Sequence, residues 1–441
     1  MKIAFLVDVF PKLSETFILN QITGLLDMGH DLEIFAKFNP GESKIHPDVE
    51  RYRLMETVHY YDMPKGWTRR LFKAIYLLLL NFGKSPRKLI KSLNFVKYGR
   101  KALSLNLFYA LIPFLRKDFD IIHCHFGPNG NLGILLRELG AVKGKIITTF
   151  HGWDATGVSP EHGGIYDALF SEGDLFTVNT KFTASQIMAL GCDQEKIVIL
   201  PVGLRLERFK FKERKISIGE KVKLLTVARL VEEKGHAYAI RAIARLIKKN
   251  DNIAYIIAGD GPLRKELQLL SKETGVEDYV EFLGNVDEGE AARLYAEAHL
   301  FILPSVTSCK GNREAQGLVL QEAQASGLPV ISTLLGGIPD GIYNGHEGFL
   351  VPEKNADALA ERIEYLLEHP TIWPEIGRQG RMFVEKKYDI NTLNQKLIGI
   401  YEALLAKQAD ALRPEYSCQP QQDHDVLSVR GERFNTADSI R

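Results

Sequence analysis

Short apolar segments of strand length alternate with helical patterns along most of this chain. In the first half, these segments are residues 2–7, 31–36, 121–125, 146–150, 175–178 and 197–200. Such alternation is typical of a parallel sheet whose two faces are covered by helices. The pattern therefore predicts an α/β fold.

The alternation starts again after a polar, basic segment at residues 208–220. The second set of strand-like segments covers residues 223–228, 254–259, 280–284, 300–303, 330–333 and 348–351. The chain has 441 residues, a length that fits two or three domains of about 100–200 residues each. We expect two doubly wound domains with the functional site in the cleft between them, because such sheets bind ligands outside the carboxyl ends of their strands.

Composition argues against several broad classes of protein. The net charge of +1 gives no overall attraction to nucleic acid. The longest apolar run, residues 102–115, is shorter than the roughly 18 residues of a membrane span and contains Pro113. The N-terminal apolar segment meets Asp8 and lacks the features of a signal peptide. The four cysteines include no CxxC pair, so we expect reduced thiols in a cytoplasmic protein.

Two glutamates, Glu314 and Glu322, flank a predicted helix start at Gly317. A helix start offers N–H groups and the positive end of the helix dipole to an anion. If every step between the two were helical, they would be separated by about 12 Å, against the roughly 5 Å between the carboxyl groups of a retaining glycosidase. The pair is therefore better suited to holding an extended sugar nucleotide at both ends than to cleaving one bond, although solvated charges on a surface helix are the more frequent alternative.

Two cations, Arg229 and Lys234, follow the first strand of the second half. They are expected at its carboxyl end, facing the cleft, where charge-assisted hydrogen bonds of about 1.5–3 kcal/mol each would suit a diphosphate. A structural pairing with Glu232 and Glu233 is an equally frequent alternative.

Glycines and histidines mark other strand ends. Gly259 and Gly261 would permit close backbone approach to a ligand, although a tight turn explains them equally well. His151 can hydrogen-bond a sugar hydroxyl or a phosphate oxygen, while a structural role is the more frequent alternative. His123 and His125 lie on one predicted strand, and we expect one to face inward and the other outward. No third ligand has a suitable spacing, so no metal site is predicted.

Residues 63–117 contain thirteen Lys or Arg and no Asp or Glu. Basic amphipathic helices with aromatic residues are typical of peripheral membrane binding, and each cation near anionic lipid can contribute about 1 kcal/mol. The alternatives are a solvated helix surface, a groove for an anionic acceptor head group, or nucleic acid, for which no recognised module is present. The predicted membrane patch includes Arg69, Arg70, Lys73, Arg87, Lys88 and Lys91.

Five elements occur in an order that resembles the retaining glycosyltransferases of family 4, which have the GT-B fold. They are residues 10–17, His151 with Gly152, Arg229 with Lys234, residues 259–262, and the segment from Glu314 to Glu322. The first element and residues 125–127 look most like bacterial colanic acid and exopolysaccharide glycosyltransferases. The resemblance covers nearly all of residues 1–405.

The resemblance implies a role for each matching position. Glu322 would hold the ribose hydroxyls and Glu314 the transferred sugar. Arg229 and Lys234 would bind the diphosphate, and His151 would contact the sugar near the reacting carbon. Further donor contacts are implied for Gly259, Gly261, Asn285, Val286, Gln316, Gly317, Leu318 and Val319. First-loop or acceptor-side contacts are implied for Ser14, Glu15, Thr16 and His125; this loop lacks the glycines found in many members.

The implied reaction moves a sugar from a nucleotide-diphosphate donor to a glycan or lipid-linked acceptor with retained anomeric configuration. Arg229, Lys234 and the helix start would supply the positive clamp, so no metal or other cofactor is expected. No covalent nucleophile stands out, which favours same-face attack with the leaving phosphate accepting the proton. The expected location is the inner face of the cell membrane, on an anionic surface and without nucleic acid.

The predicted domains are an acceptor-side domain at residues 1–205 and a donor domain at residues 206–380. A helix at residues 381–409 would cross back to the first domain, and residues 410–441 would be a disordered tail. One alternative is another GT-B enzyme, an epimerase or sugar-phosphate synthase, which the basic stretch disfavours. Another is a non-catalytic nucleotide-sugar-binding subunit, disfavoured because His151, Arg229, Lys234 and Glu314 are all present.

Overall fold

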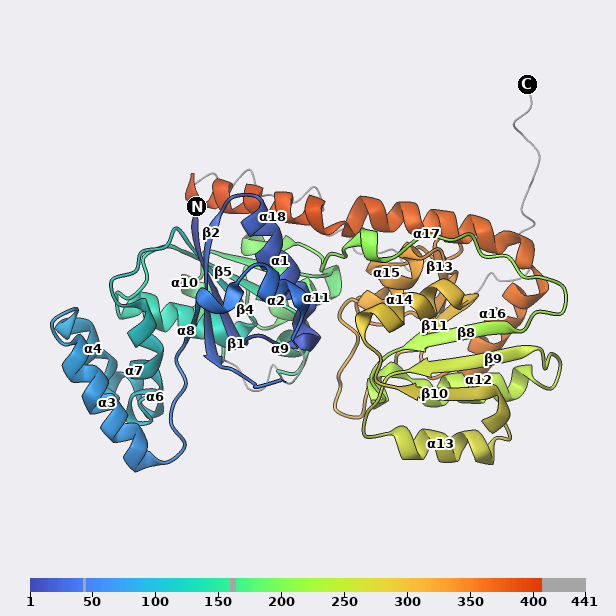
Figure 1. Ribbon diagram of the computed structural model, residues 1–441, viewed down its shortest axis with the longest axis horizontal. Helices are drawn as coiled ribbons and strands as arrows, with labels where there is room; N and C mark the ends of the chain where they lie inside the picture. The colour runs from blue at the N-terminus through green and yellow to red at the C-terminus, as the bar shows by residue number, and fades with distance from the viewer. Residues whose placement is uncertain (43–44, 159–163, 407–441) are drawn as a thin grey trace, which may run out of the picture.

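The computed structural model describes residues 1–42, 45–158 and 164–406. Within them lie two parallel sheets, each with helices on both faces (Figure 1). The first sheet has seven strands in the order β3-β2-β1-β4-β5-β6-β7, and the second has six in the order β10-β9-β8-β11-β12-β13. The prediction of two doubly wound α/β domains is confirmed.

The first sheet reproduces the predicted strands and adds one. Residues 3–7 of its central strand β1 are fully buried because helices cover both faces of the sheet. The added strand, β3, is only three residues long and half-buried, too short to show a sequence pattern. The strands are β1 (Lys2–Val9), β2 (Asp31–Phe38), β3 (Val58–Tyr60), β4 (Ile121–His125), β5 (Lys145–Phe150), β6 (Leu175–Val178) and β7 (Ile197–Ile199). The helices that flank this sheet are α1 (Thr16–Asp27), α2 (Pro47–Arg51), α8 (Gly127–Glu138), α9 (Trp153–Thr156), α10 (Asp167–Glu172) and α11 (Lys181–Ala189).

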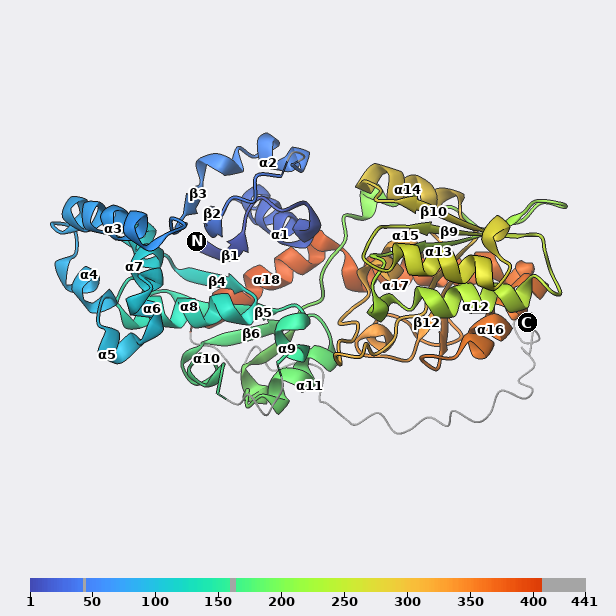
Figure 2. The ribbon, with the colours of Figure 1, turned by 90° about the horizontal axis from the view of Figure 1, so that it is seen from below.

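A group of helices between β3 and β4 forms one end of the molecule, at the left of Figure 1 and of Figure 2. We call it the helical excursion: α3 (Trp67–Asn81), α4 (Pro86–Ser92), α5 (Phe95–Tyr98), α6 (Arg100–Leu103) and α7 (Asn106–Leu111). Residues 107–111, from the longest apolar run, are buried in the core of the first domain. No helix in the described residues is long and apolar enough to cross a membrane.

The second sheet contains all of the strands predicted for it. They are β8 (Val222–Val227), β9 (Ile253–Ala258), β10 (Val280–Gly284), β11 (Leu300–Leu303), β12 (Val330–Thr333) and β13 (Gly348–Val351). The helices around it are α12 (His236–Leu246), α13 (Arg264–Glu273), α14 (Glu288–Glu297), α15 (Leu318–Ala325) and α16 (Ala356–Glu368).

Two long helices at the end of the described chain run along both domains (Figure 1). Helix α17 (Trp373–Tyr388) packs on α15 of the second domain, and α18 (Ile390–Leu405) packs on α1 of the first. The chain turns between them at Asp389, whose carboxylate accepts hydrogen bonds from the first-turn amides of α18. The described part of the segment proposed as one helix at residues 381–409 therefore comprises the end of α17 and all of α18, and residues 407–409 lie outside the described residues. The predicted tail at residues 410–441 lies outside the described residues.

Candidate active site

Each sheet reverses its strand order once, between β1 and β4 in the first and between β8 and β11 in the second. In doubly wound sheets, ligands bind outside the carboxyl ends of the strands at such a reversal. The loops after β8 and β11 carry Arg229, Lys234 and Glu314. The structure thus brings these three predicted residues to the reversal of the second sheet.

Lys234 and Glu314 form an ion pair across this reversal. The Lys234 Nζ lies 2.5 Å from the Glu314 Oε2, and the two side chains are only 17% and 13% exposed. The two loops are also joined by a hydrogen bond of 3.0 Å from the Val306 N–H to the Glu233 carbonyl. Arg229 stays 74% exposed, 3.7 Å from Glu233. The alternative pairing with glutamates of its own loop therefore describes Arg229 and not Lys234.

Gly259 and Gly261 are required by the protein backbone itself. Gly259 has φ +144°, and a Cβ on it would lie 1.9 Å from the Ala228 carbonyl oxygen. A Cβ on Gly261 would lie 2.5 Å from the Leu230 carbonyl oxygen. These glycines allow the turn after β9 to pack against the loop that carries Arg229. The tight-packing alternative accounts for both positions.

Helix α15 begins at Leu318, shortly after Glu314 of the ion pair in the sequence. Gly317, at φ +77°, precedes the helix, and the N–H groups of Leu318 and Val319 have no intrahelical acceptor. Gln316 has a structural role that was not evident from the sequence. Its side chain is buried and exchanges two hydrogen bonds, of 2.9 and 3.0 Å, with the backbone of Val202. It ties this loop to the segment between the domains.

Glu322 lies one turn into α15, where its Oε2 accepts a hydrogen bond of 2.7 Å from the Tyr295 hydroxyl. Burial raises the pKa of Glu322 to about 7, and the nearby Glu288 adds to this, while the Tyr295 hydrogen bond acts in the opposite direction. The carboxyl group therefore titrates near neutral pH. Asn285 and Val286 follow β10 in an exposed loop, with Val286 half-buried.

The histidine prediction for β4 was wrong in its geometry. His123 and His125 are both buried, and their rings stack with centroids 4.5 Å apart, because residues two apart on a strand point to the same face. His125 Nδ1 lies 3.0 Å from His151 Nε2. Since His125 is fully buried behind His151, it supports that ring and is not placed to touch an acceptor.

Burial keeps this cluster neutral. It lowers the pKa of His151 to about 3, with His123 adding to the effect, and it lowers the pKa of His123 to about 3. His123 is held at its other side by Tyr401 of α18, with 2.5 Å between Nδ1 and the hydroxyl. A neutral His151 acts as a hydrogen-bonding group, not as a cation.

Aromatic residues that the sequence did not single out pack against the His151 ring. The ring of Phe17 lies 4.6 Å from the His151 ring and that of Phe126 lies 4.7 Å from it, between centroids. Phe17 stands in the first-loop motif, which was the one signal for it. Thr16 begins α1, Glu15 pairs with Lys12 at 2.6 Å, and Ser14 lies in a short 3-10 turn.

Contacts between the two domains bring the segments that carry His151 and Glu314 together. A Cβ on Gly152 would lie 2.4 Å from the Ala315 Cβ, so these two loops touch. The Thr180 hydroxyl donates a 2.9 Å hydrogen bond to the Ala315 carbonyl. His151 and Glu314 are each one residue from this contact. The segments that carry His151 and Glu314 thus meet where the two domains touch.

The predicted membrane residues divide into two groups. Arg69 and Arg87 are exposed, and Lys88 is half-buried. Arg70 donates to the Ser104 carbonyl at 3.2 Å, Lys73 lies 3.7 Å from Asp62, and Lys91 binds the Glu138 carbonyl. Arg70, Lys73 and Lys91 therefore also hold the helical excursion in place.

An apolar stripe runs along the outside of α3. It consists of Phe72, Ile75, Tyr76 and Leu79, spaced as on one face of a helix, and all four are exposed. Phe72 and Leu79 are each 74% exposed. Within the described chain, no group of three or more His, Cys, Asp or Glu could hold a metal ion.

The sequences of known proteins match both domains of this chain. Residues 14–208 match the family described as Glycosyltransferase Family 4, and residues 207–382 match Glycosyl transferases group 1. The chain is 34% identical to the putative colanic acid biosynthesis glycosyltransferase WcaL of Salmonella typhimurium and to the amylovoran biosynthesis glycosyltransferase AmsK of Erwinia amylovora. Each alignment covers 92% of this chain and 100% of the relative.

Solved structures share the fold at low sequence identity. HepE of Anabaena, in complex with UDP and glucose, aligns with a TM-score of 0.67 and 18% identity over 91% of this chain and 100% of that one. Sucrose-phosphate synthase of Thermosynechococcus elongatus gives 0.65 and 19% over 92% and 100%. The family resemblance read from the five sequence elements is confirmed, and this chain belongs to the family 4 glycosyltransferases, enzymes of the GT-B fold.

Proposed function

We propose that this glycosyltransferase moves a sugar from a nucleotide-diphosphate donor to a lipid-linked glycan, with retention, during synthesis of a cell-surface polysaccharide. The Lys234–Glu314 ion pair carries the proposal, because it places a cation and a carboxylate at a strand-order reversal beside a helix start. The polysaccharide assignment draws on relatives named for colanic acid and amylovoran biosynthesis. The donor assignment draws on HepE, whose structure contains UDP and glucose.

We expect Lys234 to exchange its partner when the donor binds. A donor diphosphate replaces Glu314 as the partner of Lys234 and receives the free amides at the start of α15. Glu314 is then released to accept hydrogen bonds from sugar hydroxyls. Lys234, Arg229 and the helix dipole would stabilise the charge of the leaving diphosphate, which is the charge that a metal ion would otherwise balance.

His151 would bind the transferred sugar through its free nitrogen. Its Nε2 is engaged by His125, whereas Nδ1 is buried without a hydrogen-bond partner within the described chain, so donor binding would have to expose it. Retention would follow if the leaving phosphate accepts the proton of the attacking hydroxyl on the same face of the sugar.

A panel of nucleotide sugars tests the donor assignment by thermal shift. A donor at 100 times its dissociation constant should stabilise the folded enzyme by about 2.7 kcal/mol, and Glu322→Ala should weaken that binding. Proton NMR of the product then reports the anomeric configuration, and transfer in excess chelator reports metal dependence. An inverted product would refute retention, and absence of any nucleotide-dependent shift would refute the donor assignment.

We also propose that the enzyme contacts an anionic membrane surface, and the α3 stripe supports this. Its apolar side chains are flanked by a segment with thirteen cations and no acidic residue, a pattern typical of helices that lie in an anionic membrane surface. Phe72→Ser with Leu79→Ser should abolish co-sedimentation with phosphatidylglycerol vesicles. Leu269→Ser on α13 is the matched control, because Leu269 is also an exposed leucine but lies in the second domain. Equal binding to neutral phosphatidylcholine vesicles would refute the electrostatic part.

A further inference from the structure

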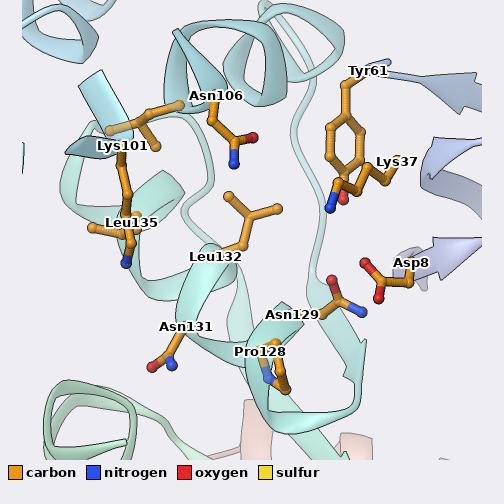
Figure 3. A pocket seen from close by; sticks show the side chains of 11 residues that line it. Asp8, Lys37, Tyr61, Lys101, Asn106, Pro128, Asn129, Asn131, Leu132 and Leu135 are labelled. Atoms are coloured by element: carbon orange, nitrogen blue, oxygen red, sulfur yellow. The ribbon is translucent and has the colours of Figure 1, made fainter. Parts of the chain in front are cut away.

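A cavity of about 200 Å³ opens at the strand-order reversal of the first sheet. Asp8, Lys37 and Tyr61 reach it from the ends of β1, β2 and β3, and Asn129 from the first turn of α8. Lys101 and Asn106 close it from α6 and α7 of the helical excursion (Figure 3). This is the position where a doubly wound sheet binds its ligand, and none of the donor residues lies there.

The charges in this cavity are unpaired. Across the residues that the structure describes, Asp8, Lys37 and Lys101 form no ion pair, in contrast with Lys234 and Glu314. Figure 3 shows Asp8, Lys37, Tyr61 and Asn129 gathered on one side of the cavity and Lys101 on the other, with Leu132 between them. Two amines against one carboxylate favour an anion, while the carboxylate and amides suit hydroxyl groups.

The cavity is built rather than incidental. Tyr61 and Asn129 are buried, with Tyr61 only 6% and Asn129 only 4% exposed. The Asn129 amide donates a 2.8 Å hydrogen bond to the His125 carbonyl, so this wall is joined to the strand that supports His151. At about 30 Å³ of liquid volume per water, the cavity has the space of several waters, which is the scale of one sugar ring.

The excursion links this cavity to the α3 stripe. The Tyr109 hydroxyl of α7 donates a 2.7 Å hydrogen bond to the Arg70 carbonyl of α3, and Arg70 in turn donates to the Ser104 carbonyl between α6 and α7. A membrane that contacts α3 would therefore lie against the same group of helices that forms one wall of the cavity.

We propose that this cavity binds the acceptor through a sugar ring that carries a negatively charged group, with Lys37 and Lys101 holding the charge and Asp8 a ring hydroxyl. The inference rests on the proposed transfer to a lipid-linked glycan and names the chemistry of that acceptor. The charge can come from the phosphate that joins the sugar to its lipid or from a carboxylate on the sugar itself.

Soluble probes test the cavity without knowledge of the full acceptor. Isothermal calorimetry with glucose 1-phosphate, glucuronic acid and methyl glucoside compares a phosphate, a carboxylate and a neutral ring. We expect binding of at least one charged probe and at least tenfold weaker binding of methyl glucoside. The charged probe that binds more tightly identifies the source of the charge. Equal affinity for the neutral ring, or no binding by either charged probe, would overturn the proposal.

Variants locate the binding. Lys37→Gln with Lys101→Gln should weaken the charged probe at least tenfold, while Lys265→Gln, an exposed lysine of α13, should leave its affinity unchanged. Lys234→Ala should also retain the probe, which separates the cavity from the diphosphate clamp. Loss of probe binding in Lys234→Ala together with full binding in the double variant would place the probe in the donor site and refute the inference.

The nucleotide thermal shift separates this inference from the proposed function. If the double variant keeps the full nucleotide shift, its donor domain is folded and intact. If no nucleotide shifts the wild-type enzyme but the charged probe binds as expected, the donor proposal fails while the cavity stands.

Discussion

The two strand-order reversals of this molecule treat charge in opposite ways. At the reversal of the second sheet, Lys234 and Glu314 neutralise each other at 2.5 Å and are largely shielded from solvent. At the reversal of the first sheet, Asp8, Lys37 and Lys101 surround a cavity without ion pairs among the described residues. The ion pair of the second sheet must exchange partners to bind an anion, whereas the cavity of the first sheet is already open to one. A paired site keeps a reactive centre ordered before the substrate arrives, and an unpaired one favours capture.

Breaking the paired side should give the largest effect. Lys234→Ala removes the cation that stabilises the leaving diphosphate, so kcat should fall about 100-fold, the scale of losing one transition-state contact. It also leaves the largely buried Glu314 carboxylate without its cation, with only the Ser305 hydroxyl as a partner, which should lower the melting temperature. Steady-state kinetics and thermal unfolding measure the two losses.

The double variant Lys234→Ala with Glu314→Gln is the control. It should recover the melting temperature because no unpaired charge is left, yet recover none of the turnover. Recovery of turnover together with stability would show that Lys234 serves only to neutralise Glu314.

Glu322 should make donor binding depend on pH. Its pKa of about 7 lies within the working range, and a ribose diol donates hydrogen bonds best to the ionised carboxylate. Donor affinity should therefore rise as pH increases through about 7 and fall up to about tenfold for each pH unit below it. Calorimetry between pH 5.5 and 8.5, with both limits about one and a half units from that pKa, measures the slope. Glu322→Gln should flatten it, and an equal slope in that variant would assign the titration elsewhere.

The sequence predicted the two domains because buried parallel strands appear as continuous apolar runs bounded by turns. The family resemblance assigned Lys234 and Glu314 to one donor, and the strands that precede them, β8 and β11, are neighbours in the sheet. The sequence could not show that the two residues pair with each other, because pairing depends on how two loops 80 residues apart fold together. The same limit hid Lys37 and Lys101, which line one cavity only because the helical excursion lies near the ends of β1 and β2.

Two features of the site have local causes. Gly259 and Gly261 are explained by close approach of the Arg229 loop, and their predicted donor contacts stay a prediction. The histidines of β4 were placed on opposite faces although a two-residue spacing puts them on one. That stack is what places His125 behind His151.

His125→Phe tests that support with a smaller expected effect. Phenylalanine keeps a ring between those of His123 and His151 but removes the 3.0 Å hydrogen bond to His151 Nε2. We expect kcat to fall by about tenfold, the value of one net hydrogen bond of roughly 1.4 kcal/mol. Donor affinity should change little, and the melting temperature should fall only modestly, because the ring packing is kept while His151 Nε2 loses its buried partner. His125→Asn, which can donate again, should restore part of kcat; failure to do so, with a large loss of stability, would indicate a packing role alone.

Arg229→Ala should give the smallest effect, and it sharpens the contrast between a shielded and an exposed charge. Arg229 is 74% exposed and only 3.7 Å from Glu233, so solvent screens it where Lys234 is shielded. We expect a loss of donor affinity of about fivefold, corresponding to roughly 1 kcal/mol for an exposed charge, with little change in stability. Because the contact is screened by ions, the loss should shrink as salt is raised, whereas that of Lys234→Ala should not. Donor titrations of both variants at low and high sodium chloride measure the difference. A loss equal to that of Lys234→Ala, independent of salt, would show that the loop of Arg229 closes over the donor and buries the guanidinium in the complex.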